Sequence, residues 1–287
     1  MLNRIKSIIA MVFCLVTPAF GGSSEGSLQD LVDQLRGTPC PAALGDSTLV
    51  LNGDLLTIAR QREFKTHYPQ VQFVPGLAGG GVEVNLAGLS SDDAALLVVD
   101  LLFLKANPNV PLENLVARLD NYKPNNDSQK ELLHWARRLI NYAGGRASGL
   151  FVSGPAGVGK THITIAVAKE CLKTGQRVAF FHPEQRFLKI AAEDAIKSGV
   201  GVFVFDDVNN GFTEIGRTLA SVVLHVHSNG GRVFVTTNST LEKLLEAAVG
   251  LPGSADRVRF DDRTKNIFKQ LIITGDSQRS AAAWYED

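Results

Sequence analysis

The chain has 287 residues, of which 45% are hydrophobic and 20% are charged, a composition typical of globular proteins that excludes a mainly disordered or collagen-like chain. The 29 basic and 29 acidic residues give a net charge of zero, so the overall charge does not indicate nucleic acid or an acidic membrane as a partner. Cys14, Cys40 and Cys171 are too few and too scattered for a disulfide framework or a zinc site.

Residues 1–21 have the features of a secretory signal peptide. Arg4 and Lys6 precede the apolar run 8–16, and a small-x-small site follows at 19–21. The run is shorter than the roughly 20 residues that span a bilayer, which favours a cleaved signal over a permanent anchor. A buried or interfacial helix, or a start codon assigned too early, is the alternative. If the segment is not cleaved, it is the part of the chain expected to contact a membrane.

Residues 28–118 are expected to form a small α+β module without a recognisable chemical motif. The pattern of apolar residues predicts short elements, with helices at 28–36, 94–104 and 111–119 and strands at 48–51, 71–74 and 82–86. The polar segment SSDD at 90–93 is expected to cap the second helix. The glycine-rich loop 75–81 is interpreted as a hairpin connection, and His67 and Tyr68 as structural or surface residues. By elimination, the module is expected to bind a partner or to oligomerise.

A phosphate-binding loop, the Walker A motif, is predicted at 154–161, which reads G-x-x-x-x-G-K-T between an apolar strand at 150–153 and a helical run at 163–172. Glycines allow the backbone to wrap closely round phosphates, and the loop N–H groups and the helix N-terminus face the anion. Lys160 is expected to reach the β- and γ-phosphates of ATP, and the Thr161 hydroxyl to ligate Mg²⁺. The nucleotide-contacting residues are Gly154, Pro155, Ala156, Gly157, Val158, Gly159, Lys160 and Thr161.

Two further predicted strands end in polar residues. The buried run 200–205 leads into Asp206 and Asp207, which is the Walker B arrangement. Asp206 is expected to hold Mg²⁺ through water and Asp207 to polarise the attacking water. The strand that ends at Asn238 would bring its amide between that water and the γ-phosphate. A strand that simply ends in a polar turn is the alternative, and the phosphate loop upstream disfavours it.

The order of elements predicts the fold. A further strand at 176–181 continues an alternation of buried strands and helices, which indicates a parallel sheet with helices on both faces. The expected fold class is α/β, a P-loop NTPase three-layer sandwich with a mostly parallel sheet, plus the small N-terminal α+β module. Ligands of such sheets bind at the carboxyl ends of the strands.

Residues 119–287, a little over half of the chain, resemble the DnaC/IstB-like branch of the AAA+ ATPases, which contains helicase loaders and transposase helpers. The resemblance is carried by the segment LDNYKP at 119–124, the amphipathic helix 129–142 and the phosphate loop with His162 behind it. It implies that His162 belongs to the nucleotide site and that Asn238 is the sensor-1 residue.

Two C-terminal motifs are similar to motifs of the same family. The R-x-x-D-R motif at 259–263 implies that Arg263 is the arginine finger supplied to a neighbouring subunit, with Arg257 as a competing candidate. The D-S-x-R motif at 276–279 implies that Arg279 is the sensor-2 arginine. A solvated surface charge is the alternative for each arginine. A finger supplied in trans implies a homo-oligomer or a related ATPase as partner.

The sequence departs from the family pattern in three places. Asp207 stands where the family usually has Glu, so slow hydrolysis is expected. Residues 251–255 look like an insertion, and the N-terminal module and signal are not implied by the resemblance. A nucleic-acid-binding face would depend on a few basic residues, namely Arg257, Arg259, Lys265 and Lys269.

The sequence therefore predicts an ATP-binding protein whose Mg²⁺-dependent hydrolysis is coupled to conformational change or to assembly on a protein or nucleic-acid partner. The alternative is a nucleotide-dependent adaptor with little turnover, including an exported effector. A guanine-reading N-K-x-D motif and an arginine-rich lid are both missing, which disfavours a GTPase or a small-molecule kinase. The signal segment indicates export or a membrane tether, whereas an ATPase core needs an ATP-containing compartment such as the cytosol.

Overall fold

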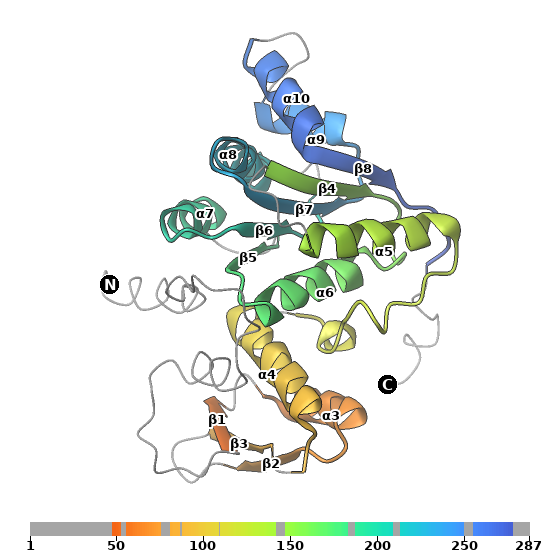
Figure 1. Cartoon of the computed structure of the whole chain (residues 1–287), viewed down its shortest axis with the longest axis vertical. Helices are drawn as coiled ribbons and strands as arrows, with labels where there is room; N and C mark the ends of the chain where they lie inside the picture. The colour runs from red at the N-terminus through yellow and green to blue at the C-terminus, as the bar shows by residue number, and fades with distance from the viewer. Residues whose placement is uncertain are drawn as a thin grey trace. The chain divides into compact units, whose positions relative to one another are not determined.

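The computed structural model describes most of the chain (Figure 1). The described residues are 48–52, 56–75, 81–86, 88–108, 110–141, 147–182, 187–208, 213–249 and 255–277. The predicted signal segment 1–21 and the predicted helix 28–36 lie outside them. The chain divides into two compact units, one of Met1–Ala117 with Leu172–Gly175, and one of Arg118–Cys171 with Gln176–Asp287.

The first unit contains an antiparallel sheet in the order β1-β3-β2, built from β1 (Thr48–Asn52), β2 (Gln72–Pro75) and β3 (Gly81–Asn85). The predicted pairing of the second and third strands is confirmed, with Phe73 opposite Val84. Helix α3 (Ile58–His67) is not predicted by the sequence pattern, because Phe64 is the one residue of this helix that is buried and no apolar stripe marks it.

Helix α4 (Ser91–Ala106) supplies the apolar core of the first unit. The side chain of Ser90 accepts a hydrogen bond from the backbone N–H of Asp93, so the predicted cap is confirmed. The one buried carboxylate described in this helix, Asp100, accepts a 2.8 Å hydrogen bond from the Tyr68 hydroxyl. Tyr68 is itself buried, in keeping with its interpretation as a structural residue.

The predicted helix at 111–119 is wrong. The chain forms only the short 3₁₀ turn η1 (Leu112–Asn114), in which the N–H of Leu115 bonds to the carbonyl of Leu112. The turn does not extend because the N–H of Arg118 bonds to the Asn121 side chain at 2.8 Å, which takes a donor that a helix would need. Leu115, Val116, Ala117 and Leu119 are buried without a helical backbone, whereas Leu112 is exposed.

The second unit contains a five-stranded parallel sheet in the order β5-β6-β7-β4-β8. Its strands are β4 (Ala147–Ser153), β5 (Val178–Phe181), β6 (Val202–Phe205), β7 (Gly231–Thr237) and β8 (Phe268–Ile272). The predicted α/β fold class of the P-loop NTPase type is confirmed. Strand β8, an edge strand with three exposed residues, is missing from the predicted set because its pattern is only partly apolar.

Helices cover both faces of this sheet. They are α5 (Asp127–Ile140), α6 (Lys160–Lys173), α7 (Leu188–Lys197), α8 (Thr213–Asn229), α9 (Leu241–Val249) and α10 (Ala255–Ile267). Phe203 and Phe205 pack into the core formed with α7 to α10, and the alternating Val202 and Val204 face the other layer. Figure 1 shows α5 and α6 on one side of the sheet and α7 and α8 on the other.

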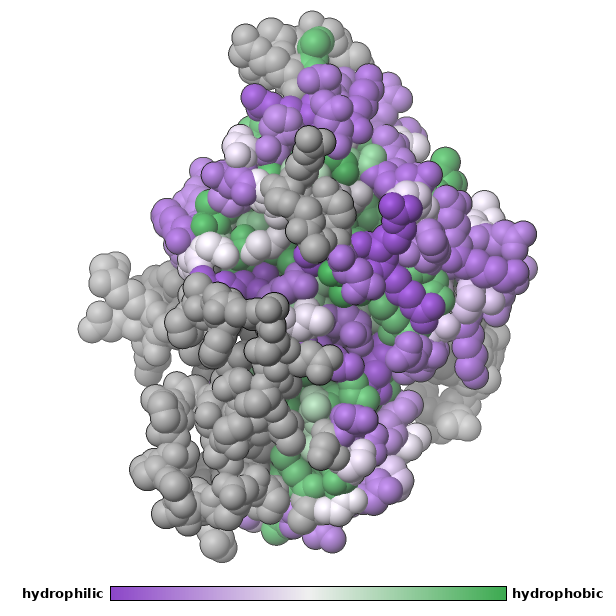
Figure 2. Space-filling model, in the orientation of Figure 1, coloured by the Kyte–Doolittle hydropathy of each residue, from purple (hydrophilic) through white to green (hydrophobic). Residues whose placement is uncertain are grey.

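The outer surface of the second unit is mainly hydrophilic around α5 in the view of Figure 2. No helix within the described ranges combines the length and apolar character needed to cross a bilayer. The parallel strands β4, β6 and β7 all point the same way, so the residues that follow them, Gly154, Asp206 and Asn238, meet at one edge of the sheet.

Candidate nucleotide-binding site

The loop 154–161 connects β4 to α6, which begins at Lys160. Gly157 and Gly159 have φ angles of 82° and 89°, a left-handed conformation that glycine adopts without a Cβ penalty. Close packing also requires glycine here. A Cβ on Gly157 would lie 2.0 Å from the Ser277 hydroxyl oxygen, and one on Gly159 would lie 2.8 Å from the Tyr122 ring.

Lys160 is buried, with 7% of the residue exposed, and its ammonium group donates to oxygen atoms of the loop and of Asn238. Nζ donates to the carbonyls of Gly154 and Pro155 at 2.8 and 2.6 Å, and to Oδ1 of Asn238 at 2.7 Å. The cation therefore lies inside the curve of the loop, beside the end of β7. This is the position from which it can exchange carbonyl oxygens for phosphate oxygens.

Asp206 follows β6 and is 1% exposed. Its Oδ1 accepts a 2.6 Å hydrogen bond from the Thr236 hydroxyl, whereas the buried Oδ2 has no hydrogen-bond partner among the described residues. Burial raises the pKa of this carboxyl group, and the Thr236 hydroxyl, His182 and the Thr161 hydroxyl oppose that rise only in part. Thr161 and Asp206, the two predicted metal ligands, are thus close to each other.

The oxygen atoms of Thr161 and Asp206 suit a hard divalent cation. Mg²⁺ prefers carboxylate and hydroxyl oxygens, and a buried carboxylate oxygen without a donor is the group that such an ion would satisfy. The donor set therefore fits the Mg²⁺ that the sequence predicts.

Asp207 has a φ angle of 51°, and it is one of two described non-glycine residues in the left-handed region. Its N–H donates to the Thr236 hydroxyl at 3.1 Å, and its Oδ1 accepts from the Asn238 amide at 3.2 Å. The Asp207 carboxylate thus faces the Asn238 amide. Asn238 therefore links the loop lysine to the second acid.

His162 lies on the first turn of α6. Its Nε2 lies 3.0 Å from the carbonyl oxygen of Arg118 and 2.9 Å from Oδ1 of Asn121. Both oxygens are acceptors, so the Nε2–H tautomer of His162 donates to them. Burial is the main cause that lowers the pKa of the imidazole. His162 therefore connects helix α6 by hydrogen bonds to the segment 118–121, which precedes α5.

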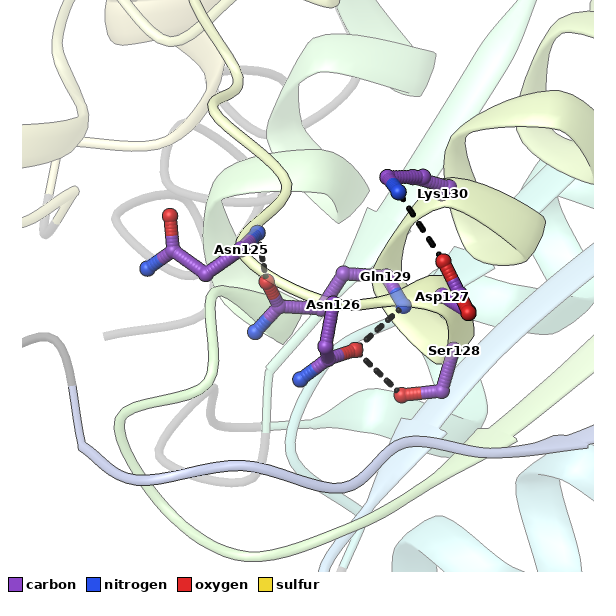
Figure 3. A network of polar contacts seen from close by, with 6 residues as sticks. All are labelled: Asn125, Asn126, Asp127, Ser128, Gln129 and Lys130. Atoms are coloured by element: carbon purple, nitrogen blue, oxygen red, sulfur yellow. Dashed lines mark hydrogen bonds and ion pairs between the residues drawn. The ribbon is translucent and has the colours of Figure 1, made fainter.

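The N-terminus of α5 contains site residues that the sequence motifs did not identify (Figure 3). Gln129, 1% exposed, accepts from the N–H of Asn125 at 2.7 Å and donates to the carbonyl of Val158 in the loop at 3.3 Å. Tyr122 donates to the same carbonyl at 3.5 Å, and burial raises its pKa to about 12. The feature of the sequence that could have indicated Gln129 is its place three residues after Asn126, the capping residue of this helix.

The segment after β8 crosses the loop. The N–H of Ile273 donates to the carbonyl of Ser153 at 2.7 Å, and Asn126 donates through Nδ2 to the carbonyl of Thr274 at 2.8 Å. The segment then reaches Ser277, whose side chain lies against Gly157. Arg279 lies outside the described residues, two positions beyond this contact.

The two candidates for the predicted arginine finger, Arg263 and Arg257, lie in α10. Arg263 is half-buried, and Arg257 is in the same helix. An arginine supplied to a neighbouring subunit acts outside its own chain, so its role remains a prediction.

The five-stranded parallel sheet, the glycine loop between β4 and α6, and the acidic pair at the end of β6 are the features of the P-loop NTPase fold. The model of the family described as "IstB-like ATP binding protein" matches residues 129–246, which confirms the predicted resemblance of this core to the DnaC/IstB-like AAA+ ATPases.

Individual proteins are similar to the same region. The chain is 31% identical over 138 residues to the chromosomal replication initiator protein DnaA of Caulobacter vibrioides, which covers 47% of this chain and 26% of that protein. The chain thus spans about a quarter of the length of this relative. A crystal structure of DnaI matches with a TM-score of 0.48 and 21% identity, over 60% of this chain and 95% of that one. The DnaC helicase loader gives a TM-score of 0.40 and 23% identity, over 55% and 97%.

Proposed function

We propose that this protein is an ATPase that binds Mg·ATP at the loop 154–161 and hydrolyses it slowly, with turnover coupled to assembly. The observation that supports it best is the convergence of Lys160, Asp206 and Asn238 at neighbouring strand ends, where one hydrogen-bonded chain joins Lys160 to Asn238 and Asn238 to Asp207. These are the charges and dipoles that phosphoryl transfer to water requires.

In this proposal Thr161 and Asp206 would hold Mg²⁺, and the buried Oδ2 of Asp206 is the oxygen available for it. The ion would neutralise charge on the phosphate oxygens of ATP. Lys160 gives up its carbonyl partners for phosphate oxygens, which keeps the number of its hydrogen bonds. Asp207 orients and polarises the attacking water, and Asn238 holds the Asp207 carboxylate at the γ-phosphate end.

A specific observation also supports the alternative of a nucleotide-dependent adaptor with little turnover. Asp207 is one methylene shorter than glutamate, and Asn238 already engages its carboxylate at 3.2 Å. In this alternative, the short side chain and its bond to Asn238 keep the carboxylate too far from a water molecule at the γ-phosphate to polarise it. In the adaptor, ATP would order the core so that the module at 28–118 engages a protein partner.

Assembly enters the proposal through the arginines. Arg263 would complete a neighbour's site, and Arg279 would contact the γ-phosphate, so the partner is a second copy of this chain or a related ATPase. Use of ATP requires an ATP-containing compartment. The proposal therefore places the core in the cytosol, or in a recipient cell if residues 1–21 direct export, and N-terminal sequencing of the native chain distinguishes Met1 from a start near Gly22.

The test is ATP binding followed by single-turnover hydrolysis at increasing protein concentration. Lys160→Ala should abolish binding, while Lys173→Ala, at the exposed end of the same helix, should bind like the parent. Turnover that rises with concentration supports the ATPase, whereas tight binding with no turnover at any concentration supports the adaptor. Tight ATP binding by Lys160→Ala would overturn the site itself.

A mixing experiment tests the finger. Lys160→Ala lacks a nucleotide site but keeps Arg263, and Arg263→Ala keeps the site but lacks the finger. Each alone should be inactive, and a mixture should regain part of the activity because one chain completes the other's site. A mixture that stays inactive, with both variants still assembled, argues against Arg263.

A further inference from the structure

The hydroxyl of Thr236 contacts both acidic residues of the candidate site. Thr236 lies in β7 and is fully buried. The parallel register of β6 and β7 pairs Phe205 with Val235, so Asp206 and Thr236 are the next residues along the two strands. The Thr236 hydroxyl therefore lies beside the Asp206 carboxylate, and a hydrogen bond joins them.

The single proton of this hydroxyl is donated to Asp206. Oγ1 of Thr236 lies 2.6 Å from Oδ1 of Asp206, within the range of charge-assisted O–H···O⁻ hydrogen bonds. This bond restricts the rotation of the carboxylate and occupies Oδ1. Among the described residues, Oδ2 is left as the buried oxygen without a donor. Thr236 thus makes the two oxygens of Asp206 different from each other.

The same threonine also contacts the turn that follows Asp206. Its hydroxyl accepts from the N–H of Asp207 at 3.1 Å, and its carbonyl accepts from the N–H of Val208 at 2.8 Å. Asp207 has a φ angle of 51°, a backbone conformation that is uncommon for a residue with a Cβ atom. Three consecutive residues, 206 to 208, are therefore hydrogen-bonded to Thr236.

A threonine hydroxyl has one proton and two lone pairs, and here the proton is used on Asp206 and a lone pair on the N–H of Asp207. We propose that Thr236 is a positioning residue of the nucleotide site, whose hydroxyl orients Asp206 toward a divalent cation and holds the backbone of Asp207. The inference rests on the proposed function for the cation. It adds the residue that leaves one defined carboxylate oxygen of Asp206 for that ion.

The role requires a hydroxyl and not only a side chain of this size. Thr236→Val keeps the shape and removes the hydroxyl, whereas Thr236→Ser keeps the hydroxyl. Thr237→Val is the matched control, because Thr237 is the next residue of β7 and is equally buried. Within the described residues, the Thr237 hydroxyl bonds to the carbonyl of Val208 and to the N–H of Ser239, and not to either acid.

The test is the affinity of the full chain for Mn²⁺, measured by electron paramagnetic resonance with a non-hydrolysable ATP analogue bound. Mn²⁺ prefers the same oxygen ligands as Mg²⁺. Thr236→Val should weaken Mn²⁺ binding by about 10- to 100-fold, the usual effect of removing a hydrogen-bond partner of a metal ligand. Thr236→Ser and Thr237→Val should bind Mn²⁺ like the parent. Unchanged affinity for the analogue in EDTA shows that each variant is folded, and Thr236→Ala is a second variant without the hydroxyl.

Three outcomes would overturn the positioning role alone. They are parent-like Mn²⁺ affinity in both variants without the hydroxyl, an equal loss in Thr237→Val, and a loss at neutral pH that disappears at alkaline pH. The last would show that the variant protonates Asp206 and does not misorient it. If the parent itself binds no Mn²⁺ beside the analogue, the proposed metal site fails and this inference fails with it, so the two failures are distinguishable.

Hydrogen exchange of the metal-free protein, followed by NMR, tests the second contact of the hydroxyl. In Thr236→Val, the amide of Asp207 should exchange faster because its acceptor is gone. The amide of Val208 should keep its protection, since it bonds to the backbone carbonyl that the variant retains. If the amide of Asp207 stays as protected as in the parent, the hydroxyl does not hold this turn and the proposal is overturned.

Discussion

The ammonium group of Lys160 lies 2.7 Å from Oδ1 of Asn238, which joins the phosphate loop to the end of β7. The same amide donates through Nδ2 to Oδ1 of Asp207 at 3.2 Å. One asparagine thus uses its acceptor on a cation and its donor on a carboxylate. Aspartate lacks the donor and alanine lacks both groups, so Asn238 is the residue type that this bridge requires.

We expect Asn238→Ala to slow single-turnover hydrolysis by about 100-fold, the usual effect of removing one preorganised polar group from a reacting centre. ATP affinity should change little, because Lys160 keeps its two loop carbonyls until phosphate replaces them. Equilibrium binding and single-turnover rates measure the two effects separately. Asn229→Ala at the exposed end of α8 is the control. Unchanged turnover would remove Asn238 from the mechanism.

Gly157→Ala should destabilise the core and weaken ATP binding. Alanine at a φ of 82° costs about 1 to 2 kcal/mol in backbone strain, and its Cβ would also overlap Ser277. Gly199→Ala, at a φ of 73° with only the end of the Arg177 side chain 3.5 Å away, should show the strain alone. Urea unfolding and ATP titration of both variants measure the difference.

Adding Ser277→Gly to Gly157→Ala tests the steric part. The second change removes the hydroxyl and Cβ that the new methyl group would meet, so ATP affinity should recover in part while the backbone strain stays. If the double variant binds ATP no better than Gly157→Ala, the contact between the loop and Ser277 does not matter for the nucleotide.

The strands of the ATPase core could be predicted because their residues are buried on both faces. Runs such as 202–205 are continuously apolar, and the polar residue that ends each run marks the edge where a ligand binds. Strand β8 has three exposed residues out of five, so its pattern resembles that of a loop. Helix α3 was missed for a similar reason, since Phe64 alone anchors it.

The phosphate loop and the acids could be predicted because their chemistry needs fixed residue types at short spacing. The residues that pack around the phosphate loop could not be predicted from the sequence. Gln129 and Tyr122 reach the carbonyl of Val158 only after the chain brings the segment 122–129 to the phosphate loop, and nothing in the local sequence indicates that contact. The steric requirement for glycine at position 157 could not be predicted either. It comes from Ser277, which is 120 residues away in the sequence and lies against Gly157.

Asn126 separates two roles of the α5 N-terminus. Its Oδ1 caps the helix by accepting from the N–H of Gln129 at 3.0 Å, and its Nδ2 donates to the carbonyl of Thr274 at 2.8 Å. Asn126→Asp keeps the cap and adds a favourable charge at the helix N-terminus, but it places a carboxylate oxygen against a carbonyl. Asn126→Ala loses both contacts and about 1 kcal/mol of helix stability.

Hydrogen exchange distinguishes these variants. With Asn126→Asp, the amides of Ile273 and Thr274 should exchange faster while those of α5 keep their protection. With Asn126→Ala, both sets should exchange faster. Unchanged exchange at Ile273 and Thr274 in the aspartate variant would show that Asn126 does not hold the C-terminal segment on the loop.

Asp206 should make the metal-free protein less stable as the pH rises. Burial raises the pKa of its carboxyl group above the ordinary 3.8 that it has in the unfolded chain. Between those two values the folded state binds more protons than the unfolded state, so the free energy of unfolding falls as pH rises through the window. Each unit of difference corresponds to about 1.4 kcal/mol.

Asp206→Asn should abolish this dependence, because its amide keeps an acceptor for the Thr236 hydroxyl without the buried charge. Urea unfolding in EDTA from acidic to neutral pH should show the variant gaining stability relative to the parent as pH rises. Thr236→Val removes a hydrogen bond that lowers the pKa of Asp206, so it should widen the pH window. Addition of Mg·ATP should reverse the order, since it can stabilise only the protein that retains the carboxylate. If Asp206→Asn were less stable than the parent at neutral pH without metal, the buried carboxylate of Asp206 would not destabilise the metal-free protein. The assignment of its unpaired oxygen to a cation would then be contradicted.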